Sequence, residues 1–369
     1  MALTAGHVSD VPNLDQVPET TTTSLSSLFS PRFSKGVDVG RIGVKPPKFL
    51  VVGHRGSGMN SLQSSDRRMK AFKENSILSF NSAARFPVTK DDCPVIFHDN
   101  FILSEENCDR AESIRVPLLW PQREPSKVGK SLFRKAKDGE ILSWNVERDD
   151  SLCTLEEAFQ KVNSSLGFNV ELKFDDRIVY QQEHLVHALQ SVLKVVFEHA
   201  KDRPIIFSTF QPDAALITRK LQSTYPVFFL TNGGNEIYYD VRRNSLEEGV
   251  KLCVEGGLQG IVSEVKGILR NPGAVSKIKE AKLSLLTFGK LNNVPEAVHL
   301  QHLMGIEGVI VDLVQEITEA VSEMIKPSKE QGGEEILMER EEQIRAKAKP
   351  QFMENELSFL LKLVPELNS

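Results

Sequence analysis

The chain has 369 residues, with 45 Lys and Arg against 50 Asp and Glu, so its formal net charge is −5. Hydrophobic residues make up 40% and charged residues 26%, which is typical of a folded globular protein and not of a disordered chain. The mildly acidic balance does not suit a nucleic-acid-binding protein, and no apolar run reaches the roughly 18 residues of a membrane span. We therefore expect no nucleic-acid partner and no integral membrane segment, and the oligomeric state stays open.

The cysteines give no sign of a metal site. The chain has four of them, at Cys93, Cys108, Cys153 and Cys253, and none forms a CxxC pair. A structural zinc site is therefore not indicated. Widely spaced cysteines in a long chain are typical of reduced thiols in an intracellular protein.

The first 46 residues lack sustained hydrophobic periodicity, and we predict a disordered N-terminal lead over 1–46. Residues 20–34 are rich in Ser and Thr, as in a plastid transit peptide, but the acids Asp10, Asp15 and Glu19 are not typical of one. We expect a cytoplasmic protein, with the plastid as the alternative location.

From residue 48 onward, short apolar runs alternate with helical stripes. Seven runs are typical of buried parallel strands, at residues 49–52, 168–173, 205–207, 227–230, 261–262, 283–287 and 309–311. Helices are expected at residues 182–199, 213–222, 245–255, 272–281, 294–302 and 314–325. The alternation predicts an α/β fold with a parallel sheet. The length fits a (β/α)8 TIM-type barrel of about 250 residues, and an open doubly wound sheet is the alternative, although it lacks a dinucleotide fingerprint.

A closed barrel needs an eighth strand, and only the region between the first two predicted strands can supply it. That region contains one further apolar run, Val95–Phe97, followed by a polar stretch over 105–150. We interpret residues of about 100–155 as an irregular insertion after the first βα unit, with the second strand truncated or missing. The barrel domain is predicted over 47–326, and a charged C-terminal tail over 327–369.

Candidate catalytic residues lie where predicted strands end, because barrel active sites form at the carboxyl ends of the strands. The first strand is followed by His54-Arg55, the Val95 run by His98-Asp99, and the strand at 168–173 contains Glu171 and Lys173. Histidine suits proton transfer, basic side chains suit a phosphate, and a carboxylate suits a hard cation. Each motif alone also has an ordinary structural interpretation, as a loop, a cap or a salt bridge.

Together with Glu74-Asn75-Ser76 and Ile206-Phe207-Ser208-Thr209-Phe210, these motifs in this order resemble the glycerophosphodiester phosphodiesterase family. This family is a branch of the phospholipase-C-like barrels, and its plant-type members are most similar to this chain. The resemblance covers about residues 48–325. It implies hydrolysis of small-molecule glycerophosphodiesters to sn-glycerol 3-phosphate and an alcohol, in lipid and glycerol metabolism and phosphate homeostasis. The glycerol 2-hydroxyl is expected to attack phosphorus first, giving a cyclic intermediate.

The resemblance also implies a role for each matching residue. His54 and His98 are expected to be the general acid and base. Arg55 and Lys173 are expected to contact the substrate phosphate. Glu74 and Glu171 are expected to bind a divalent metal ion, Mg²⁺ or Ca²⁺.

One departure from the family pattern concerns the metal site. The family places a strand with a Glu-x-Asp pair of metal ligands before the His-Asp motif, but here Phe86 runs directly into Pro87-Val88-Thr89. Ca²⁺ takes about 6–8 oxygen ligands, so Glu74 and Glu171 alone predict weak metal affinity and reduced activity. One alternative is therefore a catalytically impaired relative that binds phosphodiesters or a partner, and another is a different barrel enzyme acting on phosphate esters.

Overall fold

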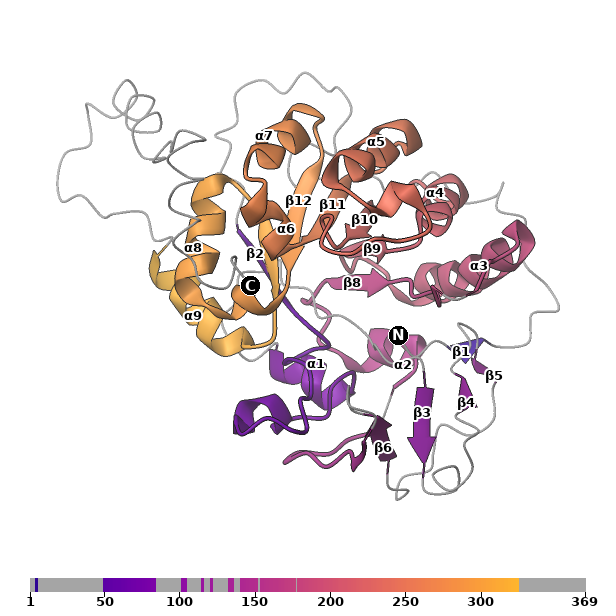
Figure 1. Ribbon diagram of the computed structural model, residues 1–369. Coiled ribbons are helices and arrows are strands. Elements are labelled where there is room, and N and C mark those ends of the chain that lie inside the picture. The colour runs from indigo at the N-terminus through magenta and orange to yellow at the C-terminus, as the bar shows by residue number, and fades with distance from the viewer. Residues whose placement is uncertain are drawn as a thin grey trace, which may run out of the picture.

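The structure is a computed structural model that describes residues 4–5, 49–83, 101–104, 114–115, 120–121, 132–135, 140–151, 153–176 and 178–324. Seven parallel strands form one sheet: β2 (Leu50–Gly53), β8 (Phe168–Glu171), β9 (Ile205–Thr209), β10 (Val227–Thr231), β11 (Gly260–Glu264), β12 (Ser284–Phe288) and β13 (Gly308–Val311). Their order is β2-β13-β12-β11-β10-β9-β8, and the sheet curves into a nearly closed barrel (Figure 1). All seven strands predicted from the sequence are confirmed, and so is the TIM-type architecture.

Helices surround the sheet (Figure 1). The strand-connecting helices are α3 (Gln182–His199), α4 (Pro212–Leu221), α5 (Leu246–Gly256), α6 (Val265–Arg270), α7 (Gly273–Glu280), α8 (Pro295–Met304) and α9 (Val314–Met324). Two shorter ones are α1 (Ile77–Ala83) and α2 (Leu155–Lys161), and 3-10 turns lie at η3 (Arg67–Lys70), η5 (Val241–Arg243) and η6 (Lys290–Asn293). The six predicted helices are confirmed. The sequence did not reveal α6, because six residues are too few to display a helical stripe.

Strand residues alternate between two buried layers, which explains why the strands are continuous apolar runs. One set fills the barrel interior: Val52, Ile206, Phe228, Leu230, Val262, Leu286 and Ile310. The neighbouring residues face outward and pack under the helices, as Phe207, Phe229 and Leu285 do. Burial on both faces fixes the register of each strand, because a slip of one residue would exchange the two layers.

The sheet ends at β2 and β8, which do not pair with each other. The described residues between them add no strand to this sheet. The prediction that the second strand is truncated or missing concerns residues 84–100, which lie outside the described residues. The Val95–Phe97 run and His98 lie outside the described residues.

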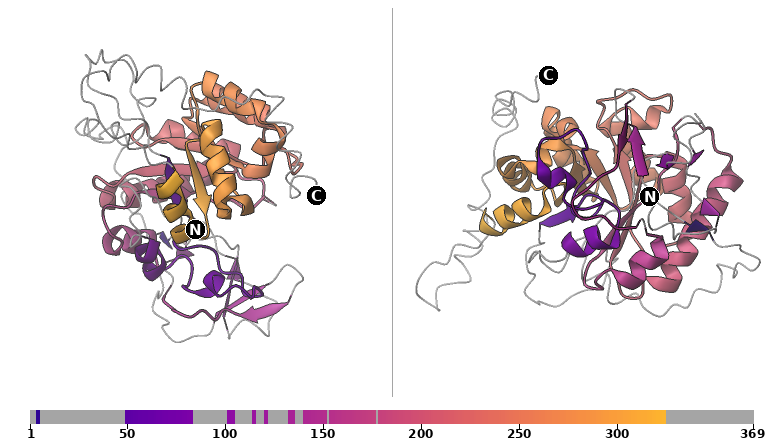
Figure 2. Two further views of the ribbon diagram at one scale, coloured as in Figure 1. Left: turned by 90° about the vertical axis from the view of Figure 1, so that its left-hand side faces the viewer. Right: turned by 90° about the horizontal axis from the view of Figure 1, so that it is seen from below.

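The insertion forms a small sheet of its own. Its strands are β3 (Phe101–Ser104), β4 (Ile114–Arg115), β6 (Leu132–Lys135) and β7 (Ile141–Ser143), paired antiparallel in the order β4-β3-β6-β7. A further pair is β1 (Thr4–Ala5), parallel to β5 (Trp120–Pro121). The left view of Figure 2 places the insertion at one end of the molecule, away from α7. It is outside the barrel wall, as expected. The expectation of an irregular stretch over 105–150 was wrong for β4, β5, β6 and β7, because runs of two to four residues show no measurable period.

Several other predictions concern the ends of the chain and its thiols. Apart from Thr4–Ala5, the predicted lead 1–46 and the tail 327–369 lie outside the described residues. Cys153 and Cys253 are free and buried, and burial raises the pKa of both thiols to about 12. No helix in the described part of the chain combines the length and apolar character needed to cross a membrane.

Candidate active site

A cavity of about 530 Å³ opens at the carboxyl ends of the barrel strands, where active sites of this architecture form. Its polar lining includes three residues selected from the sequence, namely His54, Glu171 and Lys173. Aromatic side chains of Phe174, Phe210, Tyr238 and Phe288 complete much of the wall. The cavity therefore has the mixture of apolar surface and a few polar groups that is typical of a small-molecule site.

His54 directly follows β2 and is held by Asp312, which directly follows β13. The two strands are paired, with Val311 opposite Gly53, so their ends bring the two side chains together. His54 Nδ1 lies 2.8 Å from Asp312 Oδ1. A carboxylate can only accept this hydrogen bond, so Nδ1 carries a proton.

Asp312 is itself fixed by three further contacts. The Met59 backbone N–H donates to Oδ1 at 3.0 Å, and Asn293 Nδ2 donates to Oδ2 at 3.2 Å. Asn293 Oδ1 in turn accepts from the backbone N–H of Asp312 at 2.7 Å. Burial would raise the pKa of Asp312, but the hydrogen bond and charge of His54, together with these donors, hold it below its usual value. Asp312 therefore stays ionised and keeps His54 in one orientation.

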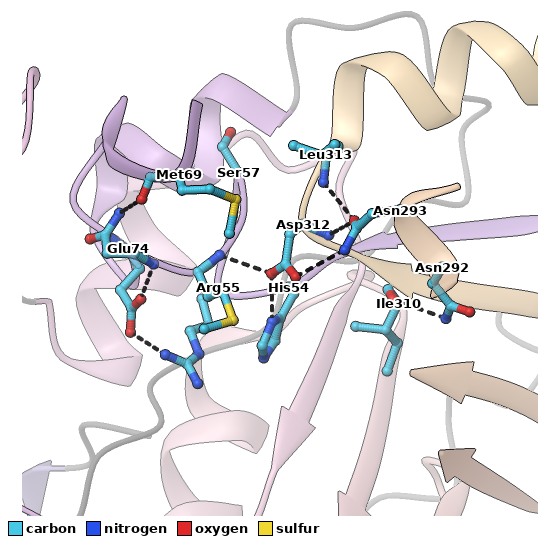
Figure 3. Close-up of polar contacts among 12 residues, drawn as sticks. His54, Arg55, Ser57, Met69, Glu74, Asn292, Asn293, Ile310, Asp312 and Leu313 are labelled. Atoms are coloured by element: carbon cyan, nitrogen blue, oxygen red, sulfur yellow. Dashed lines mark hydrogen bonds and ion pairs between the residues drawn. The ribbon is translucent and has the colours of Figure 1, made fainter. Parts of the chain in front are cut away.

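Arg55 points away from His54 toward a second carboxylate (Figure 3). Its Nη1 lies 2.6 Å from Glu74 Oε1, and both side chains are almost completely buried. Arg55 adopts a left-handed backbone conformation, with φ of 55°, which is uncommon for a residue with a Cβ. Neither Arg55 nor Glu74 is among the residues that line the cavity.

The Glu74 carboxylate is surrounded by donors. Arg134 Nη2 lies 2.7 Å from Oε1 and its Nη1 lies 3.1 Å from Oε2. The Asn60 backbone N–H donates to Oε2 at 2.5 Å. Burial would raise the pKa of Glu74, but the two guanidinium groups and the Asn60 N–H lower it, so this fully buried carboxylate remains charged.

The divalent metal ion expected from the resemblance needs several oxygen ligands open to it. Both oxygens of Glu74 already face cationic or N–H donors. Among the residues that the structure describes, no three His, Cys, Asp or Glu side chains are grouped so that they could hold a metal ion. Glu74 thus does not fit the role of a ligand in this structure, whereas Glu171 lies in the cavity.

The structure therefore separates the residues that the sequence brought together. His54, Lys173 and Glu171 line one cavity, Arg55 and Glu74 form a buried pair beside it, and His98 lies outside the described residues. Sequence reasoning missed Asp312, Asn293 and Arg134. The rule that selected His54 applies equally to Asp312, which follows the apolar run 309–311, but nothing in the local sequence points to Arg134.

Ion pairs tie together the loops at the other side of the cavity. Arg243 Nη1 lies 2.6 Å from Asp176 Oδ1, which connects the chain after β8 to the chain after β10. The Arg243 guanidinium also stacks on Tyr238, 3.7 Å from the ring centroid. These contacts stabilise the wall formed by Tyr238, Asn232 and Glu236.

Comparisons with known proteins agree with this geometry. The sequence model of the "Glycerophosphoryl diester phosphodiesterase family" matches residues 54–316. The "Glycerophosphodiester phosphodiesterase GDPD2" of Arabidopsis thaliana is 55% identical over 386 residues, covering 100% of this chain and 99% of that protein. The "Glycerophosphodiester phosphodiesterase GDPD1, chloroplastic" of the same organism is 56% identical over 384 residues, with the same coverage.

A solved structure supports the fold. A crystal structure described as a putative glycerophosphoryl diester phosphodiesterase from Silicibacter pomeroyi superposes with a TM-score of 0.54 and 16% identity, over 76% of this chain and 95% of that one. The family match extends from His54, at the end of the first barrel strand, into α9. This chain therefore belongs to the glycerophosphoryl diester phosphodiesterase family, whose members hydrolyse glycerophosphodiesters.

Proposed function

We propose that this chain cleaves glycerophosphodiesters to sn-glycerol 3-phosphate and a free alcohol, using His54 as one of its two proton-transfer groups. The observation that carries the proposal is the His54–Asp312 pair, which lies at the strand ends and in the wall of the cavity. A histidine whose tautomer is fixed by a buried carboxylate is suited to general acid–base catalysis.

The reaction divides into two displacements at phosphorus. In the first, the glycerol 2-hydroxyl oxygen bonds to phosphorus, its proton passes to a base, and the alcohol leaves with a proton from an acid. In the second, water opens the cyclic phosphate, the bond from phosphorus to the 2-oxygen breaks, and glycerol 3-phosphate is formed. His54 Nε2 serves as one of these two groups, and His98 remains the predicted partner. Proton transfer by a positioned side chain typically contributes about 10²–10⁴-fold in rate.

Lys173 is the proposed phosphate ligand in the cavity, because an ammonium group can pair with the diester anion as a point charge. Arg55 remains the second proposed ligand. Its Nη1 is occupied by Glu74, but its buried Nε has no hydrogen-bond partner among the residues that the structure describes. A hard divalent cation, Mg²⁺ or Ca²⁺, is kept as the proposed cofactor, with Glu171 as the carboxylate of the cavity wall.

A second candidate function is that of an impaired relative, which binds a phosphodiester with little turnover. Two observations favour it, the missing Glu-x-Asp motif and the enclosure of Glu74 by two arginines. This candidate predicts a measurable dissociation constant for glycerophosphocholine together with a turnover number that a chelator does not lower further.

The test is a hydrolysis assay with glycerophosphocholine, in which released sn-glycerol 3-phosphate is measured with and without chelator. The first candidate predicts turnover that His54→Ala removes and that His187→Ala, an exposed change on α3, leaves intact. Binding without turnover would select the second candidate. A version with a Glu-x-Asp strand inserted after Phe86 then shows whether the departure matters, because equal turnover and equal metal affinity in the two proteins would make it harmless.

The remaining proposals concern organisation and location. We retain a barrel domain over 47–326, with an insertion at about 100–155, a lead at 1–46 and a tail at 327–369. For location, the cytoplasm and the plastid are both retained, and the word chloroplastic in the name of one Arabidopsis relative favours the plastid. A fluorescent fusion to the C-terminus of the full chain distinguishes the two.

A further inference from the structure

One of the contacts between the insertion and the barrel is an arginine–carboxylate pair. Arg134 comes from β6 and reaches the Glu74 carboxylate, which lies at the loop before α1, 60 residues away in sequence. The guanidinium contacts both carboxylate oxygens, at 2.7 and 3.1 Å from its two terminal nitrogens. This two-point geometry is the strong, orientation-specific form of an ion pair.

A carboxylate has about four acceptor positions, and the surroundings of Glu74 use them. Oε1 faces Arg55, Arg134 and, at 3.4 Å, Asn75 Nδ2. Oε2 faces Arg134 and the Asn60 backbone N–H. The residue has no exposed surface. A divalent cation could approach Glu74 only by displacing a guanidinium or a backbone N–H group.

Further contacts hold the Arg134 side chain in this position. Its guanidinium stacks on the Trp144 ring, 4.6 Å from the centroid, and Nη1 also donates to the Asn60 carbonyl at 3.1 Å. Trp144 Nε1 donates to Asn60 Oδ1 at 2.9 Å, and the same oxygen accepts from the Glu74 backbone N–H at 3.0 Å. The network therefore closes on itself, with Asn60 at its centre.

We propose that Arg134 is the resident cation of the Glu74 site in this chain, so that Glu74 anchors the insertion to the barrel and does not ligate a divalent metal ion. A guanidinium is charged at every physiological pH, is weakly hydrated and matches a carboxylate with two parallel hydrogen bonds. It neutralises the buried carboxylate by itself, whereas Ca²⁺ would require about 6–8 oxygen ligands.

The Arg134–Glu74 pair is also linked to the loop that lines the cavity. Glu74 holds Arg55, and Asn60 belongs to the same loop as Met59, whose N–H contacts Asp312. Docking of the insertion therefore fixes the loop that presents His54. This inference does not depend on turnover, and its test measures stability and metal binding in the full chain.

The experiment uses the wild-type chain and the variants R134M, R134K and E74Q. Thermal unfolding is followed in chelator, in millimolar Mg²⁺ and in millimolar Ca²⁺, and binding of each ion is measured by calorimetry. The matched control is R148M, which removes another arginine that stacks on an aromatic ring, at 5.1 Å from Phe72. The arginines that act on the charge of Glu74 are Arg55 and Arg134.

We expect any change of Tm on adding either ion to be equal in the wild type and E74Q, because the cation proposed at Glu171 does not involve Glu74. Removing one partner of a buried ion pair leaves the other uncompensated, so R134M should lower Tm by roughly 5–15 °C. R134K keeps the charge but loses the two-point geometry and should fall between R134M and wild type, while R148M should stay within about 2 °C of wild type.

Two results would overturn the proposal. One is a wild-type chain whose Tm rises with saturable Mg²⁺ or Ca²⁺ binding when E74Q abolishes both effects. The other is an R134M variant that unfolds at the wild-type temperature. If E74Q does not fold, calorimetry on wild type and R134K decides the first result, because a metal bound at Glu74 must compete with the cation at position 134.

Discussion

Two carboxylates, the partly buried Asp312 and the fully buried Glu74, hold the loop after β2 from opposite sides (Figure 3). Asp312 binds the side chain of His54 by a hydrogen bond, and Glu74 binds the side chain of the next residue, Arg55. The backbone N–H of Met59 donates to the first carboxylate, and that of Asn60 donates to the second. Each carboxylate has a lowered pKa because these donors outweigh its burial.

The two sites differ in what lies beyond the carboxylate. Asp312 lines the cavity and its side chain keeps 14% of its surface exposed, whereas Glu74 has none. Asp312 holds a histidine, the residue type suited to proton transfer, whereas Glu74 holds two arginines, which serve as fixed cations. The same arrangement of donors therefore positions a side chain in the cavity wall on one side and joins two parts of the fold on the other.

Replacing His54 by Ala should produce the largest effect and confine it to the cavity side. The variant loses the proposed proton-transfer group, so turnover with glycerophosphocholine should fall by about 10²–10⁴-fold. Its Tm should stay close to that of wild type, because the side chain is partly exposed. The contrast between the Asp312 and Glu74 sites is wrong if turnover is unchanged in a folded H54A protein, or if H54A unfolds as readily as E74Q.

Replacing Glu74 by Gln should affect stability instead. Two buried guanidinium groups lose their anion, which typically costs about 3–5 kcal/mol. The size of the loss is measured by urea denaturation at neutral pH, with R148M as the control for a general effect of altering this part of the surface.

The wild type and E74Q should also differ in how their stability depends on pH. The pKa of Glu74 is lower in the folded chain than its ordinary value of 4.5. Its contribution to stability is therefore complete above pH 4.5 and is lost as the pH falls through the folded value. The stability gap between wild type and E74Q should narrow on acidification, and a gap that stayed constant down to acid unfolding would show that Glu74 is not charged in the fold.

Replacing Asp312 by Asn should have a smaller effect on the rate. The variant keeps the shape of the side chain but loses its charge, and His54 loses the partner that fixes its tautomer. We expect kcat to fall by roughly 10–100-fold with KM nearly unchanged, since a small misplacement of a catalytic group already costs about 10²-fold. If D312N and N293A lowered kcat by the same factor and Tm by the same amount, Asp312 would only support the fold.

The regular half of the barrel was predictable because each of its strands is buried on both faces. The runs at 205–207, 227–230 and 309–311 are apolar throughout, and they coincide with β9, β10 and β13. The region between β2 and β8 was not predictable to the same degree. Its short strands pair within the insertion over two to four residues, and such runs have no period to read.

For the candidate site, the sequence located His54 and Lys173 correctly at the cavity, because strand ends meet at one edge of a parallel sheet. It also placed Glu74 with them, since a motif shows which residue type is present but not which neighbours will neutralise it. Arg134 and Glu74 are 60 residues apart, and their contact depends on how the β6–β7 hairpin docks.

The sequence by itself determined the alternating strands and helices, the parallel sheet and the polar residues at the strand ends, because these follow from hydrophobic periodicity and from the common direction of the strands. Only the tertiary structure decided the partners of the two consecutive residues His54 and Arg55. A left-handed backbone at Arg55 turns one side chain toward β13 and the other toward the insertion. Which carboxylate then faces the cavity, and which is enclosed by arginines, depends on long-range packing that no local pattern encodes.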